Sequence, residues 1–148
     1  MIDFTLTEEQ QMLVDTTRAF VEKEMMPHEE LLERTNETPK ELAAELKQKS
    51  MELGLYACNM PEEVGGGGLD SVSVTLIEKE LGRTSLSLAE CAHRPLNILA
   101  ACVGEQIDAF LMPTMRGEKR DCIAMTEPGA GSDLRGMQCK AELKGDVW

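Results

Sequence analysis

The feature that most constrains the fold is a change of character at Gly117. Upstream of it, apolar residues recur at helical spacing between capping and stop signals, which is typical of packed amphipathic helices. Downstream of it, the short runs DCIAM, MQCKAEL and VW are separated by turn residues, a pattern typical of strands. We therefore expect a mainly α chain, with a helical domain over residues 1–117 and the opening of a β-rich domain over residues 118–148.

Three positions have the residue types that begin helices. Thr7 followed by Gln10 predicts a capping box, and the apolar stripe after it runs as far as Pro27. Thr38, followed directly by proline, predicts a second N-cap, and Asp70 predicts a third. These signals place helices over much of the first 80 residues.

Two breaks interrupt this helical part. The segment CNMPEEVGGGGLD contains Pro61 and the run Gly65–Gly68, which predicts a loop, either near an active site or a plain surface turn. A longer apolar helix is expected over residues 85–103. It contains Pro95, which predicts a kink or break at Arg94.

Charge and cysteine usage exclude several function classes. The formal net charge of −12 argues against binding to nucleic acid or to an anionic membrane surface. An odd number of cysteines without a CxxC pair argues against a disulfide framework or a zinc site. The N-terminus lacks the pattern of a secretory signal and no apolar run approaches a membrane span, so we expect a cytoplasmic protein. The cysteines are Cys58, Cys91, Cys102, Cys122 and Cys139.

The stretch AMTEPGAGSDLRG has the residues of an anion-binding bend. Pro128 ends strand pairing, and Gly129 and Gly131 permit positive φ and a close approach to the backbone. Successive N–H groups, with the hydroxyls of Thr126 and Ser132, form a concavity suited to a phosphate-bearing ligand. The stretch matches neither a P-loop nor a Rossmann fingerprint. The residues alone leave two alternatives, a ligand cradle or a tight connection between strands.

The same stretch resembles the signature of the acyl-CoA dehydrogenase family, flavoenzymes that oxidise acyl-CoA thioesters. The runs FTLTEEQQMLVDTTRAFVEKEMMP, LGLYACNMPEEVGGGGLD and RGEKRDCIAMTEP also resemble family segments, so the resemblance covers essentially the whole chain. The fixed positions of the signature are filled by Ala124, Met125, Thr126, Glu127, Ala130, Gly131, Ser132, Asp133 and Gly136.

The resemblance implies a fold and a cofactor site. The fold is the family's N-terminal helical domain followed by the first strands of its β-barrel middle domain, and the cofactor is FAD. By position, Ile123 would pack on the flavin, while the backbone of Met125 and the hydroxyl of Thr126 would face its pyrimidine edge and N5 region. Gly131 and Ser132 would lie near the FAD pyrophosphate, and Ser132 would also touch the CoA arm of the substrate.

The resemblance assigns no catalytic residue and no metal ligand to this chain. The family's catalytic base is a Glu in a C-terminal helical domain, beyond Trp148. Glu127 is expected to cap or orient its own loop rather than to act as a base. His93 and Arg94 fall in a region that lines the acyl pocket in relatives, although capping or pairing at the Pro95 kink is the alternative interpretation.

The function implied by the resemblance is an oxidoreductase of fatty acid metabolism. It would oxidise acyl-CoA to 2,3-enoyl-CoA, with hydride passing to FAD N5 and electrons to an electron-transfer flavoprotein, as a homotetramer. Because the chain stops within an expected strand, we expect part of a longer protein that is inactive by itself. The alternatives are an acyl-CoA oxidase or flavin monooxygenase of the same fold, or a non-enzymatic acidic helical interaction module.

Overall fold

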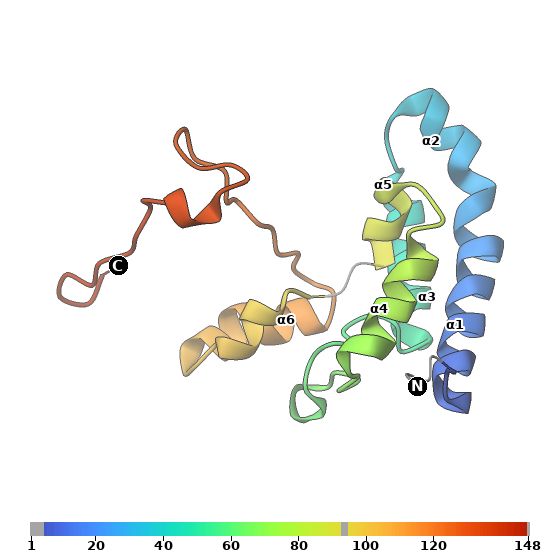
Figure 1. Cartoon of the computed structure of the whole chain (residues 1–148), viewed down its shortest axis with the longest axis horizontal. Helices are drawn as coiled ribbons and strands as arrows, with labels where there is room; N and C mark the ends of the chain where they lie inside the picture. The colour runs from blue at the N-terminus through green and yellow to red at the C-terminus, as the bar shows by residue number, and fades with distance from the viewer. Residues whose placement is uncertain (1–4, 93–94, 148) are drawn as a thin grey trace.

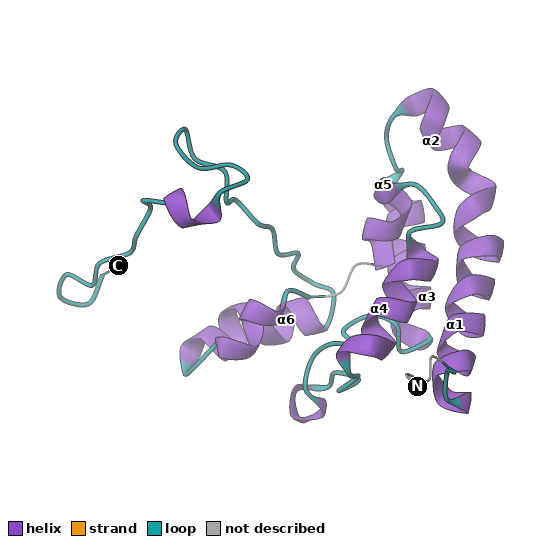
Figure 2. Cartoon of the chain, viewed as in Figure 1, coloured by secondary structure: helices purple, strands orange, loops and turns teal. Residues whose placement is uncertain are grey.

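The computed structural model describes residues 5–92 and 95–147, so the expectations for His93, Arg94 and Trp148 lie outside the described residues. The expectation of a mainly α chain is confirmed (Figures 1 and 2). Helices α1 and α4 pack against each other, and α3 packs against the single turn that follows α5. The α-helices are α1 (Glu8–Phe20), α2 (Glu29–Thr35), α3 (Lys40–Glu52), α4 (Ser71–Leu81), α5 (Leu86–Ala89) and α6 (Met112–Met115).

The first helix begins as expected and continues further than expected. Thr7 and Gln10 form the capping box, with each side chain accepting from the other residue's main-chain N–H. We expected the helix to end at Pro27. Instead a π-helical stretch, Val21–Met25, and a 3-10 turn, Met26–His28, carry the chain into α2. Proline lacks an N–H and clashes with a regular α-helical turn before it, so a change of helical type accommodates it.

The two other helix starts differ. Asp70 caps α4 as expected, because its carboxylate accepts from the main-chain N–H of Ser73 at 2.7 Å. The cap expected at Thr38 is not formed. Pro39 occupies the N-cap position of α3, and the Thr38 hydroxyl is buried without a hydrogen-bond partner. Proline fixes its own φ near the cap value, so the chain enters the helix one residue later than expected.

The long helix expected over residues 85–103 is wrong. The described part consists of α5, a 3-10 turn over Glu90–Ala92 and a second 3-10 stretch over Asn97–Ala101. Pro95 lies between the two 3-10 segments, where its missing N–H prevents one continuous hydrogen-bond ladder. A further helical stretch begins after Gly104, with a π-helical part over Ile107–Leu111 that leads into α6.

The glycine run forms a tightly bonded turn. Main-chain N–H groups of Gly67 and Gly68 donate to the carbonyls of Ala57 and Met60, at 3.1 and 2.8 Å. A Cβ at Gly66 would lie 2.1 Å from the carbonyl oxygen of Met60, so this position requires glycine. The run therefore folds back on the preceding loop as a structural turn.

The apolar interior lies in two clusters within the helical part. The larger joins α1, α3, α4 and α5, with Met25, Leu46 and Leu88 almost completely buried. The smaller joins the loop residues Ala57 and Met60 to the last helical stretch. Burial on this scale is the main stabilising contribution in a domain of this size.

Residues 118–147 take a different form from the short strands that we expected. The described part of this segment contains two isolated bridges, Glu127 with Ala130 and Lys144 with Val147, and no continuous strand. Extended backbone becomes a stable strand only when a second strand bonds to it. No other described segment pairs with residues 121–126, so this stretch is extended and unpaired. Figure 1 shows the segment standing apart from the helical bundle.

Candidate functional site

The bend around residue 130 is closed by its own main chain. The N–H of Glu127 donates to the carbonyl of Ala130 at 2.9 Å, and the N–H of Ala130 donates back at 3.1 Å. Ala130 is 3% exposed and is the only buried residue in the range 118–147. The bend is therefore a defined two-residue turn around Pro128 and Gly129 rather than an irregular loop.

The carboxylate of Glu127 anchors this bend to the chain that follows it. It accepts from the main-chain N–H groups of Gln138 and Cys139, at 2.8 and 2.9 Å. These two hydrogen bonds lower the pKa of the Glu127 carboxyl and hold it ionised. A carboxylate with a lowered pKa and both oxygens engaged is a poor proton acceptor, and the expectation that Glu127 orients its own loop is confirmed.

A short 3-10 turn, Leu134–Gly136, completes the loop. The Asp133 side chain accepts from the N–H of Arg135 at 3.1 Å and so caps this turn. With Glu127, it gives the loop two carboxylates that are both committed to main-chain N–H groups. Main-chain N–H groups of the loop and of the residues after it therefore satisfy both acidic side chains. Other N–H groups of the loop are not used in this way.

The five residues predicted for the cofactor site lie together on the extended segment and its bend, and all are exposed. Ile123 is 59% and Met125 45% exposed, and Thr126, Gly131 and Ser132 are also in the exposed class. The structure therefore brings all of them to one solvent-accessible stretch.

The conformation of the two glycines is ordinary. Gly129 and Gly131 permit positive φ, but neither adopts it in the structure. The hydrogen-bonded pair of Glu127 and Ala130 closes the turn without a left-handed residue. Both glycines instead leave open space, because a Cβ built at either would have no other atom within 4 Å. Among the described contacts, the N–H groups of Gly131 and Ser132 donate to no protein acceptor.

The start of this segment is fixed to the helical part by side-chain contacts. The Asp121 carboxylate accepts from the N–H of Leu96 at 2.6 Å, and Arg120 forms a 2.8 Å ion pair with Glu90. A cavity of about 520 Å³ lies beside these contacts and extends to Ile123. The extended segment that leads into the bend thus borders a space large enough for part of a ligand.

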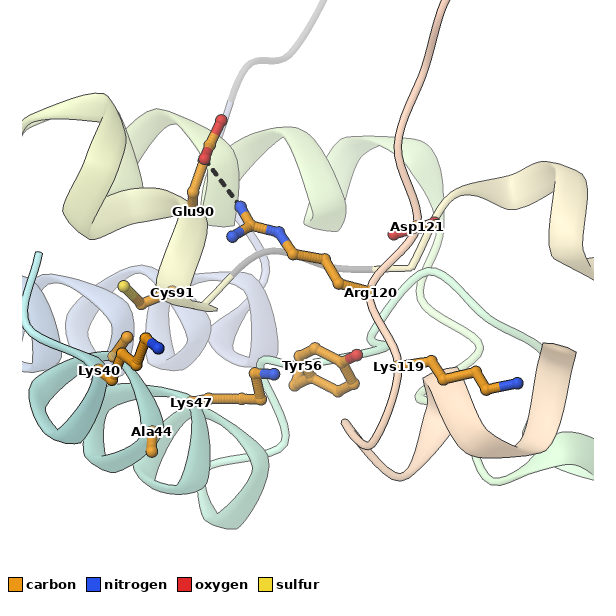
Figure 3. Close-up of a pocket in the computed structure, with 10 residues that line it drawn as sticks. Lys40, Ala44, Lys47, Tyr56, Glu90, Cys91, Lys119, Arg120 and Asp121 are labelled. Carbon is orange, nitrogen blue, oxygen red and sulfur yellow. Dashed lines mark hydrogen bonds and ion pairs between the residues drawn. The ribbon is translucent and has the colours of Figure 1, made fainter.

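A second pocket, of about 250 Å³, was not expected from the sequence. It lies between α3, Tyr56, the Glu90–Ala92 turn and residues 119–121 (Figure 3). Burial raises the pKa of the Tyr56 hydroxyl and of the Cys91 thiol, so both are neutral walls at pH 7. The signal for it was the spacing Lys-x-x-Ala-Ala-x-x-Lys, residues 40–47, which places two lysines and two small residues on one helix face.

Two classes of site receive no support from the part of the chain that the structure describes. Residues 5–92 and 95–147 contain no group of three or more His, Cys, Asp or Glu side chains placed to hold a metal ion. In the same residues, every helix is too short or too polar to cross a membrane.

Comparison with known proteins gives a consistent result. Residues 7–118 match the family model "Acyl-CoA dehydrogenase, N-terminal domain". The probable acyl-CoA dehydrogenase YngJ of Bacillus subtilis is 37% identical over 99% of this chain. Subunit CarC of the caffeyl-CoA reductase-Etf complex of Acetobacterium woodii is 31% identical over 96% of it.

A solved structure supports the same relationship. The crystal structure of an acyl-CoA dehydrogenase complexed with FAD from Bacillus anthracis matches 93% of this chain with a TM-score of 0.72 and 31% identity. The chain spans 39% of YngJ, 38% of CarC and 24% of the Bacillus anthracis chain.

Proposed function

The chain belongs to the acyl-CoA dehydrogenase family, and on that premise we propose that it contributes half of a flavin site to an enzyme that oxidises acyl-CoA thioesters to 2,3-enoyl-CoA. Residues 1–117 form its N-terminal helical domain, and residues 118–148 open its middle domain. The observation that carries the proposal is the exposed bend. Most residues that fill the family signature lie on one accessible stretch, where the N–H groups of Gly131 and Ser132 donate to no protein acceptor among the described contacts.

The residues of the bend fit FAD in chemistry and in space. Two hydroxyls and the main-chain N–H groups of Gly131 and Ser132 are donors suited to a pyrophosphate. The absence of side chains at Gly129 and Gly131 leaves room for a ligand beside the backbone. Both carboxylates of the loop accept hydrogen bonds from main-chain N–H groups, which limits their repulsion of an anionic ligand.

Each predicted residue has a distinct role in this proposal. When bound, FAD supplies the two-electron oxidant for the bond between Cα and Cβ of the acyl chain. Ile123 would pack on the ring system, and Met125 would offer its unpaired main chain to the pyrimidine edge. The Thr126 hydroxyl would face the ring, where a donor stabilises negative charge. Gly131 and Ser132 would bind the pyrophosphate, and Ser132 would also contact the CoA arm.

The catalytic base comes from outside these residues. Glu127 and Asp133 are the two carboxylates of the signature, and their hydrogen bonds to main-chain N–H groups commit both to the loop. We therefore propose that residues 1–148 bind part of the cofactor and do not oxidise acyl-CoA alone.

The electron acceptor, the location and the assembly of the whole protein are proposed from its family. We propose an electron-transfer flavoprotein as the electron acceptor, supported by the CarC relative, which is named as part of an Etf complex. We also propose that the whole protein is a cytoplasmic homo-oligomer of fatty acid metabolism. Mixing the reduced whole enzyme with an electron-transfer flavoprotein tests the acceptor, because electrons should pass to it faster than to oxygen.

A test of the cofactor site uses the whole flavoprotein that contains this chain. The double substitution Thr126→Ala and Ser132→Ala removes both hydroxyls, and we expect the purified protein to lose most of its flavin absorbance. The matched control is Thr16→Ala with Ser71→Ala, which removes two exposed hydroxyls from α1 and α4. Full FAD content in the first variant, at unchanged fold by circular dichroism, would contradict the assignment.

A second candidate is the reverse reaction, reduction of a 2,3-enoyl-CoA. It is favoured by the relative named as a caffeyl-CoA reductase subunit. The two directions are separated by assaying the whole protein with saturated and with 2,3-unsaturated thioesters, using a dye as electron acceptor or donor. With an electron acceptor of high potential, the proposed dehydrogenase should oxidise the saturated thioester faster than it reduces the 2,3-unsaturated one.

A further inference from the structure

We propose that the pocket drawn in Figure 3 binds a phosphate group, either as free phosphate or as a small phosphate monoester. Its floor is one face of α3, on which Lys40, Ala43, Ala44 and Lys47 follow one another at helical spacing. The two alanines leave a gap between the lysine arms, and both arms line the same pocket. This proposal does not depend on the flavin site.

The charge of the pocket is opposite to that of the chain. The chain has a formal net charge of −12, yet the two α3 lysines and Arg120 line one cavity. Its two carboxylates are already committed: Glu90 to the guanidinium of Arg120 at 2.8 Å, and Asp121 to the N–H of Leu96 at 2.6 Å. Neither forms an ion pair with the lysines, so the pocket keeps uncompensated positive charge.

The cationic groups retain donors for a ligand. Lys47 donates once, to the carbonyl of Gly117 at 3.1 Å, and an ammonium group has three donors. Lys40 forms no ion pair or side-chain hydrogen bond among the described contacts. Arg120 uses Nη2 for Glu90 and has other N–H groups left. Three positive groups from two separate segments suit a tetrahedral dianion better than a planar carboxylate, which one Arg would bind alone.

The fourth basic residue of the lining does not take part. Lys119 donates to the carbonyl of Ala109 at 2.8 Å, and its ammonium group lies 5.6 Å from the centre of the Phe110 ring. Figure 3 shows its side chain extending away from the two α3 lysines. The site therefore consists of Lys40, Lys47 and Arg120.

The remaining walls of the pocket limit the size of the organic group that can be attached to the phosphate. The Tyr56 hydroxyl donates to the carbonyl of Thr114, and the Cys91 thiol donates to the carbonyl of Ser87, so both present apolar surface to the cavity. A volume of about 250 Å³ is below the range of about 300–1,000 Å³ typical of drug-sized ligands. The pocket accommodates a phosphate with a few carbon atoms and is too small for a nucleotide.

Calorimetric titration of the full chain with inorganic phosphate, at constant ionic strength set with sodium chloride, tests the proposal. We expect saturable binding at one site, weakened at least tenfold by Lys40→Gln and by Lys47→Gln. Each lost hydrogen bond to a charged group has an effect of that size. Glutamine keeps the Cβ and Cγ methylene groups and a neutral polar end, so the fold should survive, which circular dichroism checks. Lys79→Gln, on the exposed face of α4, is the matched control and should change the affinity less than twofold.

The identity of the ligand follows from a second titration, with glycerol 3-phosphate. Tighter binding than inorganic phosphate identifies a monoester as the ligand, and equal or weaker binding identifies the free ion. The proposal is overturned if the wild-type chain shows no saturable phosphate binding, or if both lysine variants bind as the wild type does. Because these lysines lie outside residues 123–132, a failure here leaves FAD content and the flavin site unaffected.

Discussion

The helical part and the segment after Gly117 use their main chains in opposite ways. In residues 5–92 and 95–117, most N–H groups are bonded within helices and turns, and two apolar clusters are buried. In residues 118–147, Ala130 is the sole residue of the buried class. The comparison separates two kinds of region: the first holds the buried apolar contacts that stabilise the fold, and the second leaves main-chain donors exposed.

The two regions meet through a few polar contacts at the beginning of the second. Lys47 donates to the carbonyl of Gly117, Arg120 pairs with Glu90, and Asp121 accepts from Leu96. These contacts set where the second region starts relative to the bundle. Substitutions in the first region should therefore change global stability, while those in the second should change local order or binding.

The largest expected effect tests this division in the core. Leu46 is 1% exposed in the main cluster, so Leu46→Ala should lower the free energy of unfolding by about 3 kcal/mol. Leu143, at 57% exposure in the second region, is the matched site, and Leu143→Ala should cost less than about 0.5 kcal/mol. Urea denaturation of both variants measures the difference in the free energy of unfolding. Equal losses in the two variants would contradict this division between the regions.

The next effect concerns a buried carboxylate that joins α1 to α4. The Glu80 side chain is 3% exposed and accepts two hydrogen bonds from Arg18 and one from Arg83. Glu80→Gln should lower the free energy of unfolding at pH 7 by about 2 kcal/mol, because charge-assisted hydrogen bonds are lost in a buried position. Urea denaturation at pH 7 gives this value.

The same residue makes a prediction for pH. The hydrogen bonds from Arg18, more than those from Arg83, lower the pKa of Glu80 below its usual value of 4.5. A group with a lowered folded-state pKa stabilises fully above its unfolded pKa, and that contribution is lost as the pH falls through the folded value. The wild type should therefore lose stability below about pH 4.5 more steeply than Glu80→Gln. Parallel curves for the two proteins would contradict this role.

A smaller effect separates the two helix caps. Asp70→Ala should cost about 1 kcal/mol, because it removes the acceptor for the N–H of Ser73. Thr38→Ala should be close to neutral, since the Thr38 hydroxyl is buried without a partner and its removal leaves no new unsatisfied group. Thermal unfolding of the two variants compares them. A large loss for Thr38→Ala would show that this residue caps α3 after all.

The smallest effect on stability is expected in the second region. Glu127→Ala should change the global free energy of unfolding by less than about 0.5 kcal/mol. It should, however, speed amide hydrogen exchange at Gln138 and Cys139 at least fivefold, because these N–H groups lose their acceptor. Glu142→Ala, which removes an exposed partner of Lys140, is the control and should leave both amides unchanged.

Local signals in the sequence predicted the parts of the fold that depend on neighbours along the chain. The capping box of Thr7 and Gln10 and the cap at Asp70 were both found, since each needs only residues three positions apart. The errors at Thr38 and over residues 85–103 both involve proline. Proline shifted the start of one helix and divided the other, and the spacing of apolar residues does not show where such a change falls.

Features that need distant partners were harder to predict. Residues 121–126 have the composition of a strand, but a strand also needs a second strand to bond with. The resemblance placed Ile123, Thr126 and Ser132 on one stretch, which the structure reproduces, because they are close in sequence. The pocket of Lys40 and Arg120 was missed, because it joins residues that lie 80 positions apart.

We propose that the exposed bend supplies the donors for FAD, and amide hydrogen exchange of the whole flavoprotein, with and without its flavin, is the sharpest test. Bound FAD should slow exchange over residues 125–132, most strongly at Gly131 and Ser132, and should leave α1 and α4 unchanged. Exchange at Gly131 and Ser132 that stays the same when FAD binds would show that the bend does not supply these donors.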